Sequence, residues 1–247
     1  MTNRKVCKKV FSLLWEMICD LLFPPRCPIC DRVQNRRMKG ICSDCRKKVR
    51  YITEPRCMKC SKQLADGEQE YCRDCEKHPH LFRQGRALYD YGTVAGALYK
   101  FKYKGKKEYG EIFGEELAYF LGDYIRRIDP DALVPVPMYP AKKRMRGYNQ
   151  SQVLADALGR HLNLPVRGDL VRRVRNTRAL KALNPKERLN NLKNAFNLKG
   201  NGVKLSTIII VDDIYTTGST IDAVSKVLLE AGVKNIYFVT IAIGDGC

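Results

Sequence analysis

Cysteine is nearly absent from the last two thirds of this 247-residue sequence, because ten of its eleven cysteines lie before residue 76. Long apolar runs are absent too. The best candidate, residues 10–23, is interrupted by Glu16 and Asp20, so we expect neither a membrane span nor a signal peptide there. Extended polar tracts are also missing, and 45% of the residues are hydrophobic, which excludes a disordered chain.

Acidic residues are scarce as well, with 26 Asp and Glu against 45 Lys and Arg, a formal net charge of +19. An excess of this size indicates a polyanionic partner or an anionic surface. At this length the chain has room for one α/β domain of ordinary size and a small appendage.

Residues 10–23 carry apolar side chains at helical intervals, which predicts an amphipathic helix within residues 1–25. Because neither a span nor a signal peptide is expected, we expect the protein to be cytoplasmic and this helix to pack on its own protein. The alternative is a helix at the inner face of the membrane, with Lys5, Lys8 and Lys9 beside it.

Eight of the eleven cysteines form a repeat. Four Cys-x-x-Cys pairs make two modules displaced by 30 residues, which are Cys27, Cys30, Cys42 and Cys45, then Cys57, Cys60, Cys72 and Cys75. This spacing is typical of metal ligands rather than disulfides, and four thiolates predict a closed, structural Zn²⁺ site. Since each four-thiolate zinc adds a charge of −2, two sites would lower +19 to about +15.

The ligand pairing has two solutions, one that uses each module by itself and one that joins the first pair to the third. The repeat favours the sequential pairing. An iron–sulfur cluster or free buried cysteines would be the alternatives to zinc. His78 and His80 lie nearby and are expected to be surface residues rather than ligands. We therefore expect a double zinc-finger-like region over residues 26–84.

From residue 85 onward, strand and helix patterns alternate, which predicts a doubly wound parallel sheet. The expected strands are residues 86–91, 132–137, 205–211 and 235–243; the expected helices are 94–103, 108–128, 150–162 and 220–231. Residues 167–188 are basic and are expected to be irregular.

Residues 208–220 combine a buried strand, two acids and a small, hydroxyl-rich loop that opens a helix. The free N–H groups at a helix start favour a phosphate, and Gly218 lets the backbone approach it. Asp212 and Asp213 would repel phosphate but accept hydrogen bonds from vicinal sugar hydroxyls. The alternative is an acid pair that caps a turn beside an N-cap cluster. A phosphorylated ribose accounts for both halves of the pattern.

The whole segment resembles the phosphoribosyl pyrophosphate (PRPP) signature of type I phosphoribosyltransferases. The resemblance implies that fold for residues 85–247, with ribose hydroxyls on Asp212 and Asp213. It places the 5′-phosphate on the loop residues Thr216, Thr217, Gly218, Ser219 and Thr220. The basic loop after residues 134–137 would hold a pyrophosphate with its Mg²⁺; its cations are Lys142, Lys143, Arg144 and Arg146.

The motif Arg-Gly-Tyr-Asn-Gln at residues 146–150 narrows the resemblance to the ComF/GntX family of competence-related proteins. The order of parts agrees, from Pro24, Pro25 and Cys27 through the paired cysteines to a Lys-x-x-Gly segment at residues 102–105. The resemblance also covers Thr177, Leu183, Arg188, Asn191 and Phe196. The chain departs from the family pattern at Leu180, where we would expect glutamine. This difference puts a polar role of that position in doubt.

Two functions are compatible with these features. The family resemblance implies a protein of DNA uptake that binds PRPP and single-stranded DNA, with other competence proteins as further partners. Lys100, Lys102 and Lys104, interleaved with Phe101 and Tyr103, offer the cations and stacking surfaces that suit a single strand. The alternative is an active phosphoribosyltransferase that transfers ribose 5-phosphate to a nitrogen base or amine, although no base-recognition loop or general base is evident.

Overall fold

The computed structural model describes residues 24–35, 40–176, 195–199 and 204–244. The chain divides into two compact units, Met1–Lys48 and Val49–Cys247. The amphipathic segment at residues 10–23 lies outside the described residues, as do Thr177, Leu180, Leu183, Arg188 and Asn191. No helix within the described ranges is long and apolar enough to cross a membrane.

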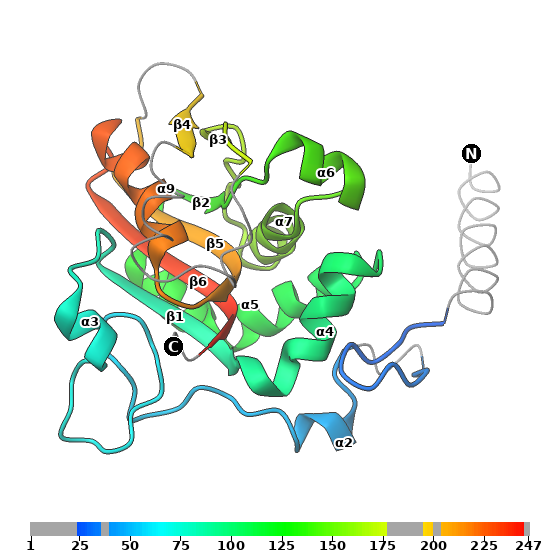
Figure 1. Cartoon of the computed structure of the whole chain (residues 1–247). Coiled ribbons are helices and arrows are strands. Elements are labelled where there is room, and N and C mark those ends of the chain that lie inside the picture. The colour runs from blue at the N-terminus through cyan, green and yellow to red at the C-terminus, as the bar shows by residue number, and fades with distance from the viewer. Residues whose placement is uncertain (1–23, 36–39, 177–194, 200–203, 245–247) are drawn as a thin grey trace, which may run out of the picture. The chain divides into compact units, whose positions relative to one another are not determined.

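The large unit is built on a parallel sheet (Figure 1). Its described strands lie in the order β1 (Gln84–Asp90), β6 (Asn235–Ile243), β5 (Thr207–Tyr215) and β2 (Ala132–Pro135). Every pairing among them is parallel, and β5 lies between β6 and β2. The predicted type I phosphoribosyltransferase fold, a doubly wound α/β sheet, is confirmed.

Helices cover both faces of this sheet. Ile208 and Ile210 of β5 share a buried cluster with Ile221 and Val224 of α9 (Ser219–Glu230). The helices α4 (Tyr91–Tyr103), α5 (Tyr109–Ile128) and α7 (Gln150–Leu162) complete the domain, and α7 contacts β5 and β2. The helices α5 and α7 approach closely at Gly114, where a Cβ atom would lie 2.3 Å from that of Ala157.

Two sequence predictions of local structure were wrong. The cationic segment before Gly147 is not a loop but a short helix, α6 (Pro140–Arg146), which begins with Pro140 and ends at Gly147 with φ +87°. Proline in the first turn and a left-handed glycine after the last are ordinary helix boundaries, so the signals were present. The basic stretch is not wholly irregular either, because β3 (Val171–Arg173) pairs antiparallel with β4 (Phe196–Leu198).

Strand β5 is longer than predicted and reaches Tyr215. Strand β6 pairs with β5 along its whole length, up to the pair Tyr215 and Ile243. On the other side β2 ends earlier, with Pro135 opposite Val211. One edge of β5 is therefore open beyond Val211, where the acid pair follows.

Candidate functional site

The two cysteine modules repeat each other in backbone geometry as well as in spacing. The N–H of the first cysteine donates to the carbonyl five residues later, at 3.0 Å in the first module and 2.8 Å in the second. A residue with positive φ closes each turn, Asp31 at 65° and Ser61 at 73°. The third cysteine of each module precedes a short helix, α2 (Ser43–Arg46) or α3 (Arg73–Lys77).

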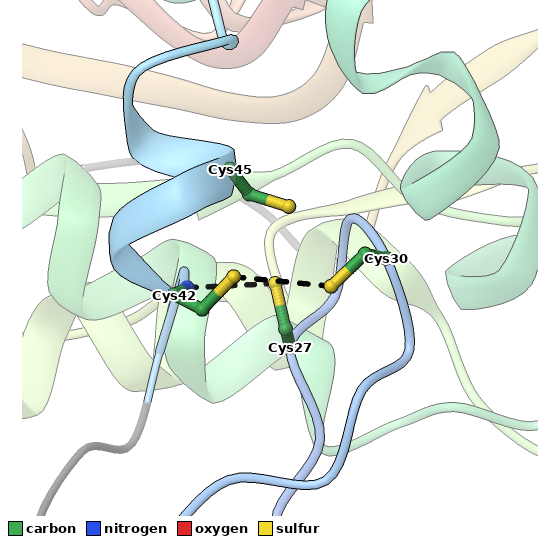
Figure 2. Close-up of side chains that lie close together, drawn as sticks. All are labelled: Cys27, Cys30, Cys42 and Cys45. Carbon is green, nitrogen blue, oxygen red and sulfur yellow. Dashed lines mark hydrogen bonds between the residues drawn. The ribbon is translucent and has the colours of Figure 1, made fainter.

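Each module brings its own four sulfur atoms to within 4.8 Å of one another, so the pairing is sequential. Figure 2 shows the first set, with its sulfur atoms turned toward one another. The Sγ atoms of Cys30 and Cys42 are 3.8 Å apart, and those of Cys60 and Cys72 are 3.6 Å apart. Tetrahedral Zn²⁺ with Zn–S bonds of about 2.3 Å holds its sulfur ligands about 3.8 Å apart, so both sets fit zinc.

The protonation of the second set agrees with a bound cation. Hydrogen bonding to the Cys57 sulfur raises the pKa of Cys60 and of Cys75 above the ordinary range, so these two thiols keep their protons when no metal is bound. A divalent metal displaces such protons and keeps all four sulfur atoms ionised. Four thiolates leave no open coordination position, so the sites are structural.

The second module is part of the core of the large unit. Cys57 and Cys60 are fully buried and share one hydrophobic cluster with Phe82 and Tyr215. The first module belongs to the unit Met1–Lys48. The second set therefore lies in the same compact unit as the end of β5, and the first set does not.

The acid pair meets two partners at the open edge of β5. The Ser151 hydroxyl, in the first turn of α7, donates to Asp212 Oδ1 at 2.8 Å. The Lys102 ammonium, near the end of α4, lies 2.6 Å from Asp213 Oδ2. The two acids thus face an α7 hydroxyl and a cation that is only 22% exposed.

This environment changes how the acids titrate. Burial raises the pKa of Asp212 to about 7, the Asp213 carboxylate adds to the rise, and the Ser151 hydrogen bond opposes it. Burial lowers the pKa of Lys102, but the two carboxylates outweigh it, so that pKa lies above its usual value. A carboxyl that titrates near neutral pH inside a polar cluster is typical of functional sites.

The Arg-Gly-Tyr-Asn-Gln motif assembles this site. The Tyr148 hydroxyl donates to the Phe101 carbonyl of α4, and Asn149 donates to the Val136 carbonyl at 3.0 Å, just after β2. The Arg146 guanidinium lies 4.8 Å from the centre of the Tyr103 ring. The motif thus ties α4, the end of β2 and the start of α7 together, next to Ser151.

The predicted phosphate loop joins β5 to α9. Gly218 has φ +75° and immediately precedes Ser219, the first residue of that helix. The Thr217 and Ser219 hydroxyls lie 2.9 Å apart and face each other across it. The first N–H groups of an α-helix have no intrahelical partner, so this end is suited to an anion.

A cationic cavity of about 680 Å³ lies at the carboxyl end of β2. Pro135 and Pro137 form part of its wall, and its basic lining residues are Lys143, Arg144, Arg172, Arg173 and Lys199. No acidic side chain lines it among the residues that the structure describes. Burial lowers the pKa of Arg173, one of these lining residues, and attraction to Asp212 opposes that shift.

The lysines and aromatic residues near the end of α4 lie in different environments. Lys102 faces the acid pair, whereas Tyr99 and Tyr103 are 54% and 61% exposed, with ring centroids 5.2 Å apart. Phe101, which the sequence suggested as a stacking surface, is fully buried. The alternation of lysines and aromatic residues had suggested one binding surface. In a helix, however, residues 99 and 103 lie on the same side and residue 101 lies on another.

His80 was predicted to lie at the surface, and this prediction is wrong. Its side chain is 3% exposed, and Nδ1 lies 2.7 Å from Asp222 Oδ2 in the first turn of α9. His78, at 56% exposed, is the surface residue that was predicted. The contact with Asp222 joins residues 142 positions apart, so no local pattern could have indicated it.

Comparison with known families and proteins agrees with this geometry. A double zinc ribbon domain model matches residues 18–76, and a phosphoribosyl transferase domain model matches residues 149–246. Competence protein F of Haemophilus influenzae is 31% identical over 85% of this chain and 93% of its own. Competence protein ComFC of Bacillus subtilis is 30% identical over 78% and 79%, and DNA utilization protein YhgH of Escherichia coli strain K12 is 28% identical over 87% and 96%.

Among solved structures, a purine phosphoribosyltransferase from Pyrococcus horikoshii matches 53% of this chain and 72% of its own at 18% identity, with a TM-score of 0.34. The sheet, the acid pair and the cysteine sets define a phosphoribosyltransferase-type domain joined to two zinc ribbons. The match to competence protein F covers most of both chains and therefore identifies the family as well as the domains. The chain belongs to the ComF/GntX family.

Proposed function

We propose that this protein binds PRPP with Mg²⁺ at the end of β5 and binds single-stranded DNA at α4, and that it acts in the uptake or utilisation of DNA. The observation that carries the proposal is the acid pair at the open edge of β5, directly ahead of a left-handed glycine at a helix N-terminus. Relatives named for competence and for DNA utilization support the biological role.

In this proposal each part of the ligand meets a matching group. The hydroxyls of Thr216, Thr217, Ser219 and Thr220 and the N-terminus of α9 bind the 5′-phosphate. Asp212 and Asp213 accept from the ribose hydroxyls. Arg144, which lines the cationic cavity, and Arg146 attract the pyrophosphate, while Mg²⁺ is held through its oxygens. Lys102 balances the charge of the acid pair and is no longer assigned to DNA.

The pH dependence of PRPP binding tests the role assigned to Asp212. Its ionised form is the hydrogen-bond acceptor, so affinity should fall as the pH drops through about 7. Ser151→Ala removes a donor that favours the ionised form, so the midpoint should move to higher pH. We expect a loss of affinity up to roughly tenfold at pH 7 and a smaller one at pH 9, measured by calorimetry. The same pH dependence of affinity in the wild type and in Ser151→Ala would contradict the role of Asp212. Titration of PRPP itself affects both proteins equally, so it does not affect the comparison.

For DNA we propose the exposed face of α4, with Tyr99 and Tyr103 as stacking surfaces and Lys100 and Lys104 as phosphate contacts. The pair of rings and the two lysines match the requirements of a single strand, which needs aromatic faces and cations together. The formal charge of +19 agrees with a polyanionic partner.

The double variant Tyr99→Ala, Tyr103→Ala should weaken binding of an oligonucleotide by at least roughly tenfold, because a stacked base contributes about 1–3 kcal/mol. Filter binding across a salt series measures this. Lys100→Gln with Lys104→Gln should instead lower the slope of log K against log salt by about 1.4. Tyr119→Ala is the matched control, since Tyr119 is 81% exposed but lies on α5. Failure of the wild type to bind at low salt would refute the DNA proposal, and an equal loss in the control would refute its location.

An active transferase is the second candidate, and one observation favours it. The cavity of about 680 Å³ at the carboxyl end of β2 is large enough for an acceptor, and Arg173 in its lining is attracted to Asp212. Pyrophosphate release from PRPP with a panel of purines, pyrimidines and ammonia tests this activity. Release with none of them would leave a binding domain.

A further inference from the structure

The first turn of α9 contains an acid whose carboxylate is held by a distant segment. Asp222 Oδ2 is 2.7 Å from His80 Nδ1, and Asp222 Oδ1 accepts from the Leu81 N–H at 2.8 Å. Residues 78–83 connect the second cysteine set to β1, and we call them the strap. Both oxygens of Asp222 are thus held by the strap, although nothing in the local sequence of α9 requires it.

The imidazole of His80 contacts the phosphate loop at three points. It meets Asp222 after the loop, and its Nε2 lies 3.4 Å from the hydroxyl of Tyr215 before the loop. At Gly218, in between, a Cβ atom would lie 2.7 Å from His80 Cε1 and 2.7 Å from the Tyr215 hydroxyl. The left-handed backbone at position 218 and the close approach of His80 therefore both require a glycine there. The loop is folded around one buried side chain.

The same contacts affect the charge at the anion site. A carboxylate in the first turn of a helix interacts well with the helix dipole but repels a phosphate bound at the same end. Two donors from the strap engage the Asp222 carboxylate and offset part of its charge. The Nδ1–H tautomer, which donates to Asp222 and lets Nε2 accept from Tyr215, satisfies both contacts of His80.

The strap leads into β1, and β1 is bonded to the second zinc ribbon. The Gly85 N–H donates to the Lys59 carbonyl at 2.8 Å, and Gln84 Nε2 donates to the Met58 carbonyl at 2.8 Å, so β1 is bonded to the turn between Cys57 and Cys60. The ring of Phe82 stacks on His80 at 4.8 Å and lies in one buried cluster with the cysteines. Through Phe82 and β1 the strap is linked to the second zinc ribbon.

We propose that His80 is a positioning residue through which the second zinc ribbon holds the phosphate loop in its binding geometry, so that loss of zinc from Cys57, Cys60, Cys72 and Cys75 loosens the loop. This inference rests on the proposed function for its ligand. It concerns the order of the loop, however, which can be measured without any ligand.

The test combines two measurements on the full chain, amide hydrogen exchange of residues 216–222 without ligand and calorimetric titration with PRPP and Mg²⁺. His80→Ala should speed the exchange at least tenfold and weaken PRPP binding by roughly tenfold, the effect of one charge-assisted hydrogen bond. His80→Asn should restore part of both, because its amide can donate from nearly the position of Nδ1. His78→Ala, in the same strap but exposed, should change neither.

Exchange measured during zinc removal gives a second readout. The loop should lose protection when zinc leaves the second set, and it should keep protection in Cys30→Ser, where only the first set is damaged. Unchanged exchange at residues 216–222 in His80→Ala, with the melting temperature confirming a folded protein, would refute the inference. Absence of PRPP binding by the wild type would instead count against the proposed function, and the exchange data would still decide the inference.

Discussion

Replacement of Asp212 and Asp213 together by asparagine should lower the affinity for PRPP in the presence of Mg²⁺ by roughly 100-fold. Asparagine has nearly the same shape as aspartate, but its amide oxygen carries no charge. Each charge-assisted hydrogen bond is worth about 1.5 kcal/mol or more, so the loss of two such bonds gives a factor of this size. Isothermal titration calorimetry measures the change directly.

The control for this variant is Asp123→Asn, since Asp123 is 88% exposed on α5 and pairs only with nearby Arg126 among its described ion pairs. Its affinity should equal that of the wild type. The double variant leaves Lys102 without its ion pair, so its thermal stability must be compared as well. Equal affinity of the folded double variant and the control would remove the acid pair from the ligand site.

Cys60→Ser should destabilise the large unit severely, whereas Cys30→Ser should leave it nearly unchanged. Cys60 is fully buried in the same cluster as Phe82 and Tyr215, while Cys30 is exposed and belongs to the other unit. Structural zinc contributes about 10–16 kcal/mol to small sites, which exceeds the net stability of most domains. Loss of one ligand should therefore lower the free energy of unfolding by about 3 kcal/mol or more.

Calorimetric melting and zinc content distinguish the two cysteine variants. We expect Cys60→Ser to lose the cooperative transition of the large unit together with one zinc per chain, and Cys30→Ser to lose one zinc alone. The same melting temperature for both variants would show that the second ribbon does not support the core. Chelation of the wild type removes zinc from both sets and should abolish the same cooperative transition.

Much of the fold could be predicted because its signals are local. Helix α7 was predicted with both ends correct, and β6 likewise, because apolar periodicity and the flanking turn residues agree there. The two cysteine sets were predictable from spacing alone, since a Cys-x-x-Cys turn presents both thiolates to one ion. Helix α6 was missed because seven residues with four cations show no apolar face, although Pro140 and Gly147 mark its ends.

The acid pair and the loop were predicted as ligand groups from one continuous segment, but the side chains that contact them were not predicted. Lys102 and Ser151 reach the acids from two other helices, and His80 reaches α9 across 142 residues. Such contacts depend on how helices and strands pack, which no window of sequence records. The alternation of lysine with Phe101 and Tyr103 was misleading for a related reason, because the helix turns one aromatic ring into the core and the other outward.

The most direct test of the account is a calorimetric titration of the wild-type chain with PRPP, with and without Mg²⁺, beside titrations with ribose 5-phosphate and pyrophosphate. We expect one PRPP per chain, an affinity that depends on Mg²⁺, and weaker binding of each fragment, because the proposal assigns a different part of the ligand to the acid pair, the loop and the cationic cavity. No binding of PRPP at millimolar concentration with Mg²⁺ present would contradict the account.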